Sequence, residues 1–184
     1  MDSKRTFLMS ELWMLTFNAA FQRANIYTKK ASDHDKSVWK AKLAADIEIN
    51  ILPIYKKGNV TDEAHIDCLN QVASWFDDEI FEKTSGTYGI AQKILNLYLK
   101  YMWIIDEISY PPPHFPIDRR IQESLKLKPL VSWTKNIKSS KDYMAVIDRA
   151  RKCSLAQNYD SLAEMELEEF SRSNIYVQLM KSKK

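Results

Sequence analysis

The sequence predicts an all-α fold of about eight helices around one core, and three observations support this prediction. Apolar residues recur at three- and four-residue spacing along most of the 184-residue chain. No segment alternates with a period of two, and neither Asn-Gly nor Asp-Gly occurs as a hairpin signal. Only 3 residues are glycine, which is few for a β-rich protein. We expect one domain over residues 1–184, with possible sub-halves at 1–84 and 85–172 and a basic tail at 173–184.

The first half of the chain predicts three helices. An apolar stripe over residues 6–27 predicts the first of them. Ser32, which is followed by acidic residues, is typical of a helix start, and Pro53 is expected to end or bend the helix that begins there. Thr61 also precedes acidic residues and predicts the start of the third helix.

The second half is predicted to be built around one helix from Gly89 to about Ile105. This segment is apolar on most sides, as is typical of a helix at the centre of its domain. The proline-rich residues 111–116 exclude helix, so an extended connection should follow. Asp118 then stands near the start of a new helix, and Pro129 is expected to end that helix.

Three shorter helices are predicted to complete the chain. The first, in residues 130–138, is a short helix or turn around Trp133, and the second begins at Ser140. Ser161 with Glu164 predicts a capping box for the last helix. That helix is expected to pack through Leu162, Met165 and Phe170. Its remaining face is expected to be solvated and carries four carboxylates, which are Glu164, Glu166, Glu168 and Glu169.

Composition excludes several classes of function. No apolar run approaches the roughly 20 residues of a membrane span, and no signal-peptide pattern is present, so a cytoplasmic protein is expected. Glycine-rich phosphate loops are absent. Cys68 and Cys153 stand apart in helical patterns and are expected to be buried free thiols. The three histidines have no metal-ligand spacing, so we expect neither a metal nor a cofactor.

Positive charge is concentrated in one segment of the chain. The whole sequence carries a formal net charge of +3, whereas residues 119–152 contain ten Lys and Arg against three acids, a net of +7. A solvated helical surface is one interpretation of this segment. A surface that faces nucleic-acid phosphates is the other.

Lys93, Lys100 and Asp118 carry the chemistry that the sequence suggests. Lys93 lies in the apolar central helix, where partial burial favours the neutral amine that acts as a nucleophile. Lys100 lies two turns further along the same face, and its better use is to hold a phosphate. A helix N-terminus favours an ionised Asp118, which can stabilise an oxocarbenium ion or help to deprotonate an attacking amine. A solvated lysine and a helix-capping aspartate are the structural alternatives.

The same stretch resembles a known family. The runs QKILNLYLKY and PPPHFPIDRRI are similar to the catalytic region of the archaeal 8-oxoguanine DNA glycosylase/lyases, a branch of the helix-hairpin-helix superfamily. That family has two lysines seven residues apart in one helix, followed by Pro-(Ile/Val)-Asp-x-Arg. The matching positions here are Lys93, Lys100, Pro116, Ile117, Asp118 and Arg120. The stretch also resembles uncharacterised bacterial helical proteins.

The family resemblance implies both a fold and an activity. The implied fold is helix-hairpin-helix glycosylase-like, and the implied activity is that of a DNA N-glycosylase with β-lyase activity on a damaged or modified base. It implies that Lys93 forms the Schiff base and that Asp118 is the catalytic aspartate. The implied partner is double-stranded DNA with a flipped base. Contacts with the DNA backbone are expected from Gly86, Gly89, Lys100, Arg119 and Arg120.

Two other functions remain open on the sequence. A non-catalytic helical DNA-binding protein would bind with an affinity that falls steeply with salt and would form no covalent product. A helical protein-interaction or defence component would have a protein partner and would use Lys93 only structurally. Most of the five tryptophans are expected in the core, although one beside a cleft would suit stacking on a flipped base.

Overall fold

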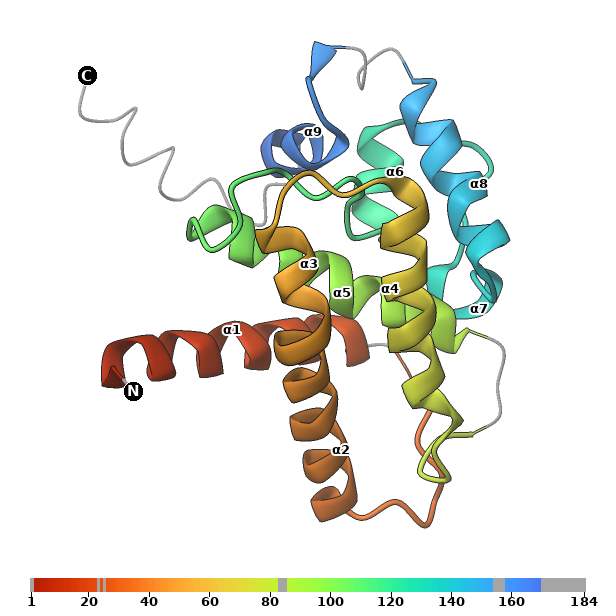
Figure 1. Ribbon diagram of the computed structural model, residues 1–184. Coiled ribbons are helices and arrows are strands. Elements are labelled where there is room, and N and C mark those ends of the chain that lie inside the picture. The colour runs from red at the N-terminus through yellow and green to blue at the C-terminus, as the bar shows by residue number, and fades with distance from the viewer. Residues whose placement is uncertain (1, 23, 25, 83–85, 154–157, 170–184) are drawn as a thin grey trace, which may run out of the picture.

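The chain folds as a bundle of helices (Figure 1). The computed structural model describes residues 2–22, 24, 26–82, 86–153 and 158–169, and in this part of the chain every regular element is a helix. An isolated antiparallel bridge joins Tyr27 to Phe81. The predicted all-α class is therefore confirmed for the described residues. Phe170 and the predicted tail at 173–184 lie outside them.

The helix that contains Pro53 changes from α-helical to π-helical hydrogen bonding before the proline. Helix α1 covers Ser3–Phe21 and ends earlier than predicted, while α2 covers Asp33–Asp46 and begins at the capping box of Ser32. A π-helical turn, Ile47–Ile51, then leads directly into α3, Leu52–Lys56. Pro53 therefore does not end this helix. The wider turn directly precedes the proline, whose nitrogen has no N–H to donate.

Helix α5, Thr87–Ile104, forms the centre of the fold. Fourteen of its 18 residues are buried, as expected for a helix that is apolar on most sides. It packs against α1 and against α4, Asp62–Ser74, which begins after the Thr61 cap as predicted. In Figure 1 it runs behind α2, α3 and α4. Counting α2, the π-helical turn and α3 as one continuous helix, the described residues form eight helices.

The helices that follow the proline-rich connection gather on one side of α5 (Figure 1). The side chain of Ser139, one residue before the predicted start, caps the helix after the short Trp133 turn by accepting a hydrogen bond from the Asp142 amide. Ser161 Oγ accepts a hydrogen bond from the Glu164 amide at 3.1 Å at the start of the last helix. These helices are α6 (Arg119–Ser124), α7 (Trp133–Asn136), α8 (Ser140–Arg151) and α9 (Leu162–Glu169).

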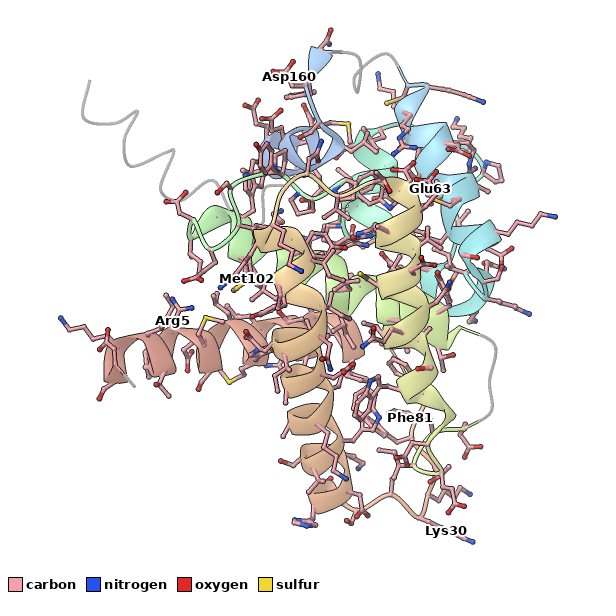
Figure 2. All side chains as sticks on the ribbon, in the orientation of Figure 1. Arg5, Lys30, Glu63, Phe81, Met102 and Asp160 are labelled. Carbon is pink, nitrogen blue, oxygen red and sulfur yellow. The ribbon has the colours of Figure 1, made fainter. Side chains whose placement is uncertain are left out.

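Aromatic side chains pack against one another at one end of the core. The ring of Phe81 lies 4.7 Å from that of Trp39 and 4.9 Å from that of Phe76, measured between centroids. Figure 2 shows Phe81 near the lower end of α4. Such edge-on and tilted pairs stabilise a core beyond the area that they bury. Tyr27 also stacks on Phe81, with centroids 5.2 Å apart, so this end of the molecule is fixed by aromatic packing.

The two cysteines lie in different surroundings. Cys68 is buried in α4, as predicted. Cys153 is only partly buried, so the prediction of burial is wrong for this residue. It follows the last turn of α8, where the helix ends and its apolar face no longer covers the side chain.

Candidate active site around Lys93 and Asp118

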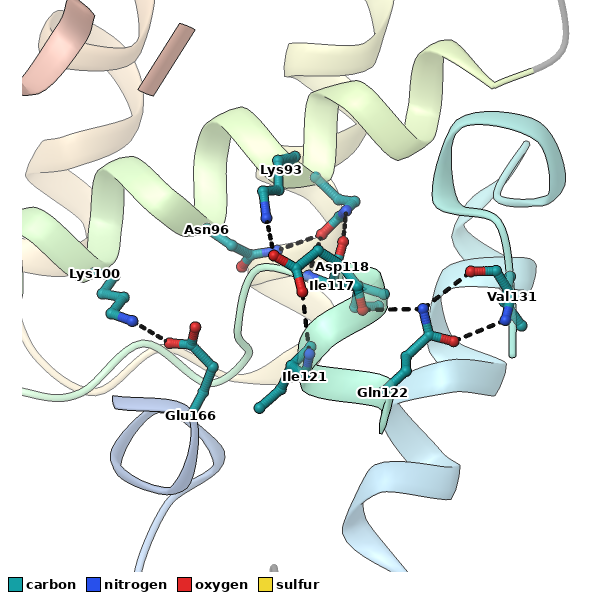
Figure 3. A network of polar contacts seen from close by, with 10 residues as sticks. Lys93, Asn96, Lys100, Ile117, Asp118, Ile121, Gln122, Val131 and Glu166 are labelled. Carbon is teal, nitrogen blue, oxygen red and sulfur yellow. Dashed lines mark hydrogen bonds and ion pairs between the residues drawn. The ribbon is translucent and has the colours of Figure 1, made fainter. Parts of the chain in front are cut away.

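The central helix and the start of α6 bring Lys93 and Asp118 into contact (Figure 3). Lys93 Nζ donates a hydrogen bond to Asp118 Oδ2 at 2.7 Å, although the two residues stand 25 positions apart in sequence. The Lys93 side chain is 7% exposed and that of Asp118 is 17% exposed. The pair is thus largely shielded from solvent, and its small open part lies mainly at the carboxylate. An amine and a carboxylate so placed can exchange a proton without an intervening water.

The two carboxylate oxygens of Asp118 make different contacts. Its Oδ1 accepts a hydrogen bond from the Ile121 amide at 3.1 Å, so the residue caps α6 as an N-cap aspartate does. Its Oδ2 faces Lys93. The predicted helix start and the predicted amine–carboxylate pair are therefore both present in the same side chain. The cap fixes the rotamer of the carboxylate, and this rotamer directs Oδ2 toward the amine.

A side-chain amide holds the proline-rich connection against α5. Gln92 Nε2 donates to the Ile117 carbonyl at 3.0 Å, and the Ile117 amide donates to Gln92 Oε1 at 3.0 Å. The neighbouring Asn96 donates to Gln92 Oε1 at 3.3 Å and to the Tyr143 hydroxyl at 3.0 Å. All four side chains are buried, so these bonds are protected from competition with water. The Gln92 contacts set the distance between Lys93 and the residue after Ile117.

A second lysine–carboxylate pair lies on the same helix. Lys100 Nζ donates to Glu166 Oε2 at 2.5 Å, and the two side chains are 11% and 3% exposed. Burial raises the pKa of Glu166, and the Lys100 ammonium opposes that rise. Glu166 was expected on a solvated face with its neighbouring glutamates. It is buried instead, because α9 turns this position inward to meet Lys100.

This second pair changes the interpretation of Lys100. A phosphate-binding lysine was expected at this position, whereas the ammonium is buried and engaged by a carboxylate. The polar face of α5 therefore meets one carboxylate from the start of α6 and one from α9 (Figure 3). Sequence reasoning missed Glu166, and the only signal for it was a single glutamate among the apolar positions of the last helix.

The two glycines at the start of the central helix pack against another helix of the protein. A Cβ added at Gly89 would lie 1.8 Å from the Trp133 carbonyl oxygen, and one at Gly86 would lie 1.9 Å from that of Thr134. The Gly89 amide donates to the Ile137 carbonyl at 3.1 Å. Phosphate contacts were expected from these glycines, but this amide already has a protein partner. The glycines allow α7 to approach α5 closely.

The two arginines after Asp118 lie at the surface. The Arg119 side chain is 71% exposed and its Nε donates to Glu123 at 2.7 Å, while Arg120 is also exposed. An exposed pair of this kind contributes little to stability, so Arg119 can leave Glu123 for another anion. Both arginines begin α6 directly after the candidate pair. Their exposed position at the start of α6 is compatible with the expected backbone contacts.

A second polar cluster lies at the start of α4 and was not predicted. Arg151 binds Asp62 through both guanidinium nitrogens, at 2.6 and 2.7 Å, and His114 Nε2 lies 3.1 Å from the same carboxylate. Burial lowers the pKa of His114 to about 4. The histidine ring of His65 stacks edge-on against that of His114, with centroids 4.5 Å apart. Among the described residues, no three or more His, Cys, Asp or Glu side chains group as metal ligands would.

Two surface hollows lie away from the candidate pair. One, of about 490 Å³, is bordered by the start of α4, by Pro111–Pro113 and by the start of α9. The other, of about 480 Å³, lies between α1 and α2 and is lined by Trp13 and Phe17. Neither Lys93 nor Asp118 lines these two hollows. Chemistry at the pair therefore does not make use of either of them.

Comparisons with known proteins add no assignment to this geometry. No protein-family model matches the chain, and no curated protein or solved structure matches it. Within the described part of the chain, no helix is both long and apolar enough to cross a membrane. The two lysine–carboxylate pairs, and the motif that carries them, are the features of the chain that suggest a function.

Proposed function

We propose that this protein is a DNA glycosylase with lyase activity, in which Lys93 is the nucleophile and Asp118 exchanges a proton with it. The observation that carries the proposal is the 2.7 Å contact between the Lys93 amine and the Asp118 carboxylate in shielded surroundings. Two independent lines support it. The motif resembles that of archaeal 8-oxoguanine DNA glycosylase/lyases, and the geometry joins the two residues that the resemblance marks as catalytic.

The chemistry begins with a proton transfer across the contact. Asp118 takes a proton from the Lys93 ammonium, and the neutral amine attacks C1′ of a nucleotide that has left the helical stack. The new C1′–N bond forms as the bond from C1′ to the base breaks, and the departing base takes the proton from Asp118. The bond from C1′ to the ring oxygen then breaks as the C1′=N bond forms, the ring oxygen receives one of the two protons of the attached nitrogen through Asp118, and the result is a protonated Schiff base.

Strand cleavage follows from the Schiff base. Loss of a proton from C2′ allows the bond between C3′ and the 3′-phosphate oxygen to break, and the phosphate leaves with the electron pair of that bond. Water then hydrolyses the imine, which returns the amine of Lys93. The Asp118 carboxylate is the nearest described base to the amine and is suited to each proton transfer at this nitrogen.

The basic segment gives the proposed site an electrostatic match to DNA. Residues 119–152 carry a net of +7, and the exposed Arg119 and Arg120 stand immediately beside Asp118. Lys135 in α7, Lys138 shortly after it and Lys141 at the start of α8 are also exposed. Binding through such cations releases counterions, so the affinity for DNA should fall steeply as salt rises.

Borohydride trapping on a duplex with an abasic site tests the proposal. The wild-type protein should form a covalent adduct, Lys93→Gln should form none, and Asp118→Asn should slow trapping by about 100-fold or more. Asparagine also caps helices, so Asp118→Asn removes the charge while the α6 cap is retained. Lys42→Gln, which changes an exposed lysine of α2, is the matched control and should trap like wild type.

Two results would overturn the proposal. One is the absence of a wild-type adduct across duplexes with abasic sites and several modified bases. The other is an adduct that persists in Lys93→Gln. Thermal unfolding of each variant shows whether a lost adduct reflects lost structure. Salt-dependent DNA binding without any adduct would favour the non-catalytic DNA-binding interpretation.

A protein-interaction function is the second candidate, and the exposed apolar residues of α1 favour it. Phe7 is 68% exposed, and apolar positions seven residues apart along α1 are exposed as well. Exposed apolar surface of this kind is typical of contact sites between proteins. This function predicts no DNA binding and a stable protein complex that Phe7→Asp abolishes. The exposed residues are Phe7, Leu8, Met14 and Leu15.

A further inference from the structure

Helix α7 is fixed against α5 by contacts that leave no room for a side chain. Gly86 has a φ of +129°, and added Cβ atoms at Gly86 and Gly89 would overlap the carbonyl oxygens of Thr134 and Trp133. The Gly89 amide bonds to the Ile137 carbonyl at the other end of α7. The backbone that carries Trp133 is therefore held at both ends relative to the helix that carries Lys93.

The indole of Trp133 borders the candidate amine. Lys93 Nζ lies over the ring, 6.0 Å from its centroid, which is near the outer limit of a cation–π contact. Trp133 packs against the core with part of its surface and exposes the rest. Part of the Trp133 side chain is thus exposed beside Lys93, whose amine contacts Asp118.

Trp133 differs from three other tryptophans in the hydrogen bonding of its indole N–H. The indole N–H groups of Trp13, Trp39 and Trp75 each donate a hydrogen bond to the protein. In the described part of the chain, Trp133 makes no such bond, and its nitrogen is not buried. Trp103 shares this feature, but it lies ten residues along α5 from Lys93, about 15 Å away by helix rise.

We propose that an extrahelical nucleobase stacks on the indole ring of Trp133 while Lys93 reaches C1′ of the same nucleotide. The inference rests on the proposed function and names its base-contacting residue. A tryptophan face can stack on any base, because every base has a π-face. A purine should therefore bind more tightly beside Trp133 than a sugar that carries no base. Exposed lysines after Trp133 are placed to contact the flanking phosphates.

A pair of duplexes that differ only in one base tests this inference. One duplex carries a single bulged guanine, and the other carries a bulged tetrahydrofuran, which has the sugar and no base. Lys93→Gln serves as the background, so that binding is measured without turnover. Trp133→Leu in that background should weaken binding of the guanine bulge by roughly 10- to 100-fold. The same change should weaken binding of the tetrahydrofuran bulge by less than about 3-fold.

Three control variants make the result specific. Trp133→Phe keeps an aromatic face and should retain most of the preference for the guanine bulge. Trp103→Leu removes a partly buried tryptophan away from Lys93 and should leave the preference unchanged. Equal losses on both duplexes, or no loss, would overturn the stacking role. Borohydride trapping by Trp133→Leu with Lys93 intact keeps the two proposals apart, because an adduct that forms with the wild-type base preference would overturn only this inference.

Discussion

Removing the ammonium that faces Glu166 should destabilise the protein. The Glu166 side chain is 3% exposed and Lys100 Nζ lies 2.5 Å from its oxygen. Removing one partner of a buried ion pair typically costs about 3–5 kcal/mol, because the other charge stays buried and uncompensated. The Lys100 side chain keeps 11% exposure, so part of the pair is solvated. We therefore expect Lys100→Met to cost about 3 kcal/mol, at the lower end of that range.

The cost of Lys100→Met should grow with pH. Burial raises the pKa of Glu166, and loss of Lys100 removes the attraction that opposes this rise. A carboxyl group with a raised pKa in the folded state binds more protons there than in the unfolded state. Folding stability is then present at low pH and falls as the pH rises from the unfolded pKa through the folded one. The variant should lose more stability near pH 7.5 than near pH 5.

Urea unfolding followed by circular dichroism measures this effect at both pH values. The double variant Lys100→Met/Glu166→Leu replaces the pair with apolar side chains and should recover to within about 1 kcal/mol of wild type. Lys42→Met, an exposed lysine of α2, should change stability by less than about 0.5 kcal/mol. A cost that is the same at both pH values, or a double variant less stable than Lys100→Met, would refute the reasoning.

Three further predictions follow from single contacts. Gly89→Ala should destabilise the protein by about 1–3 kcal/mol or more in urea unfolding, since its Cβ would meet the Trp133 carbonyl oxygen at 1.8 Å. Ser32→Ala should cost about 1 kcal/mol in the same assay, because it breaks the capping box with Asp35. His114→Gln should lose less stability than wild type as pH falls from about 6.5 toward 4, because the folded-state pKa of His114 is lowered to about 4.

The predicted helix starts show which structural features could be predicted from the local sequence. Ser32 and Thr61 were identified as caps because a side-chain oxygen followed by acidic residues satisfies the free amides of a first helical turn. The central helix was identified because its residues are apolar in nearly every direction, which suits only a buried position. Of the two outcomes expected at Pro53, an end of the helix does not occur, since the π-helical turn before the proline allows the helix to continue.

The amine–carboxylate pair was predicted as a possibility, and its geometry came from contacts remote in sequence. Lys93 and Asp118 meet because Gln92 holds the Ile117 backbone and because Asp118 caps α6. The burial of Glu166 followed from the placement of α9, for which its own sequence gave no distinct sign. The glycines suggested a phosphate contact, whereas they accommodate α7.

The sequence by itself determined the all-α class, the central place of α5 and the starts of several helices, because periodicity and capping act within a few residues of the chain. Only the tertiary structure decided which carboxylate faces each lysine of α5 and that Trp133 lies beside Lys93. The reason is physical. The protonation and reach of a charged side chain depend on what surrounds it, and those neighbours come from segments that the chain brings together only when it folds.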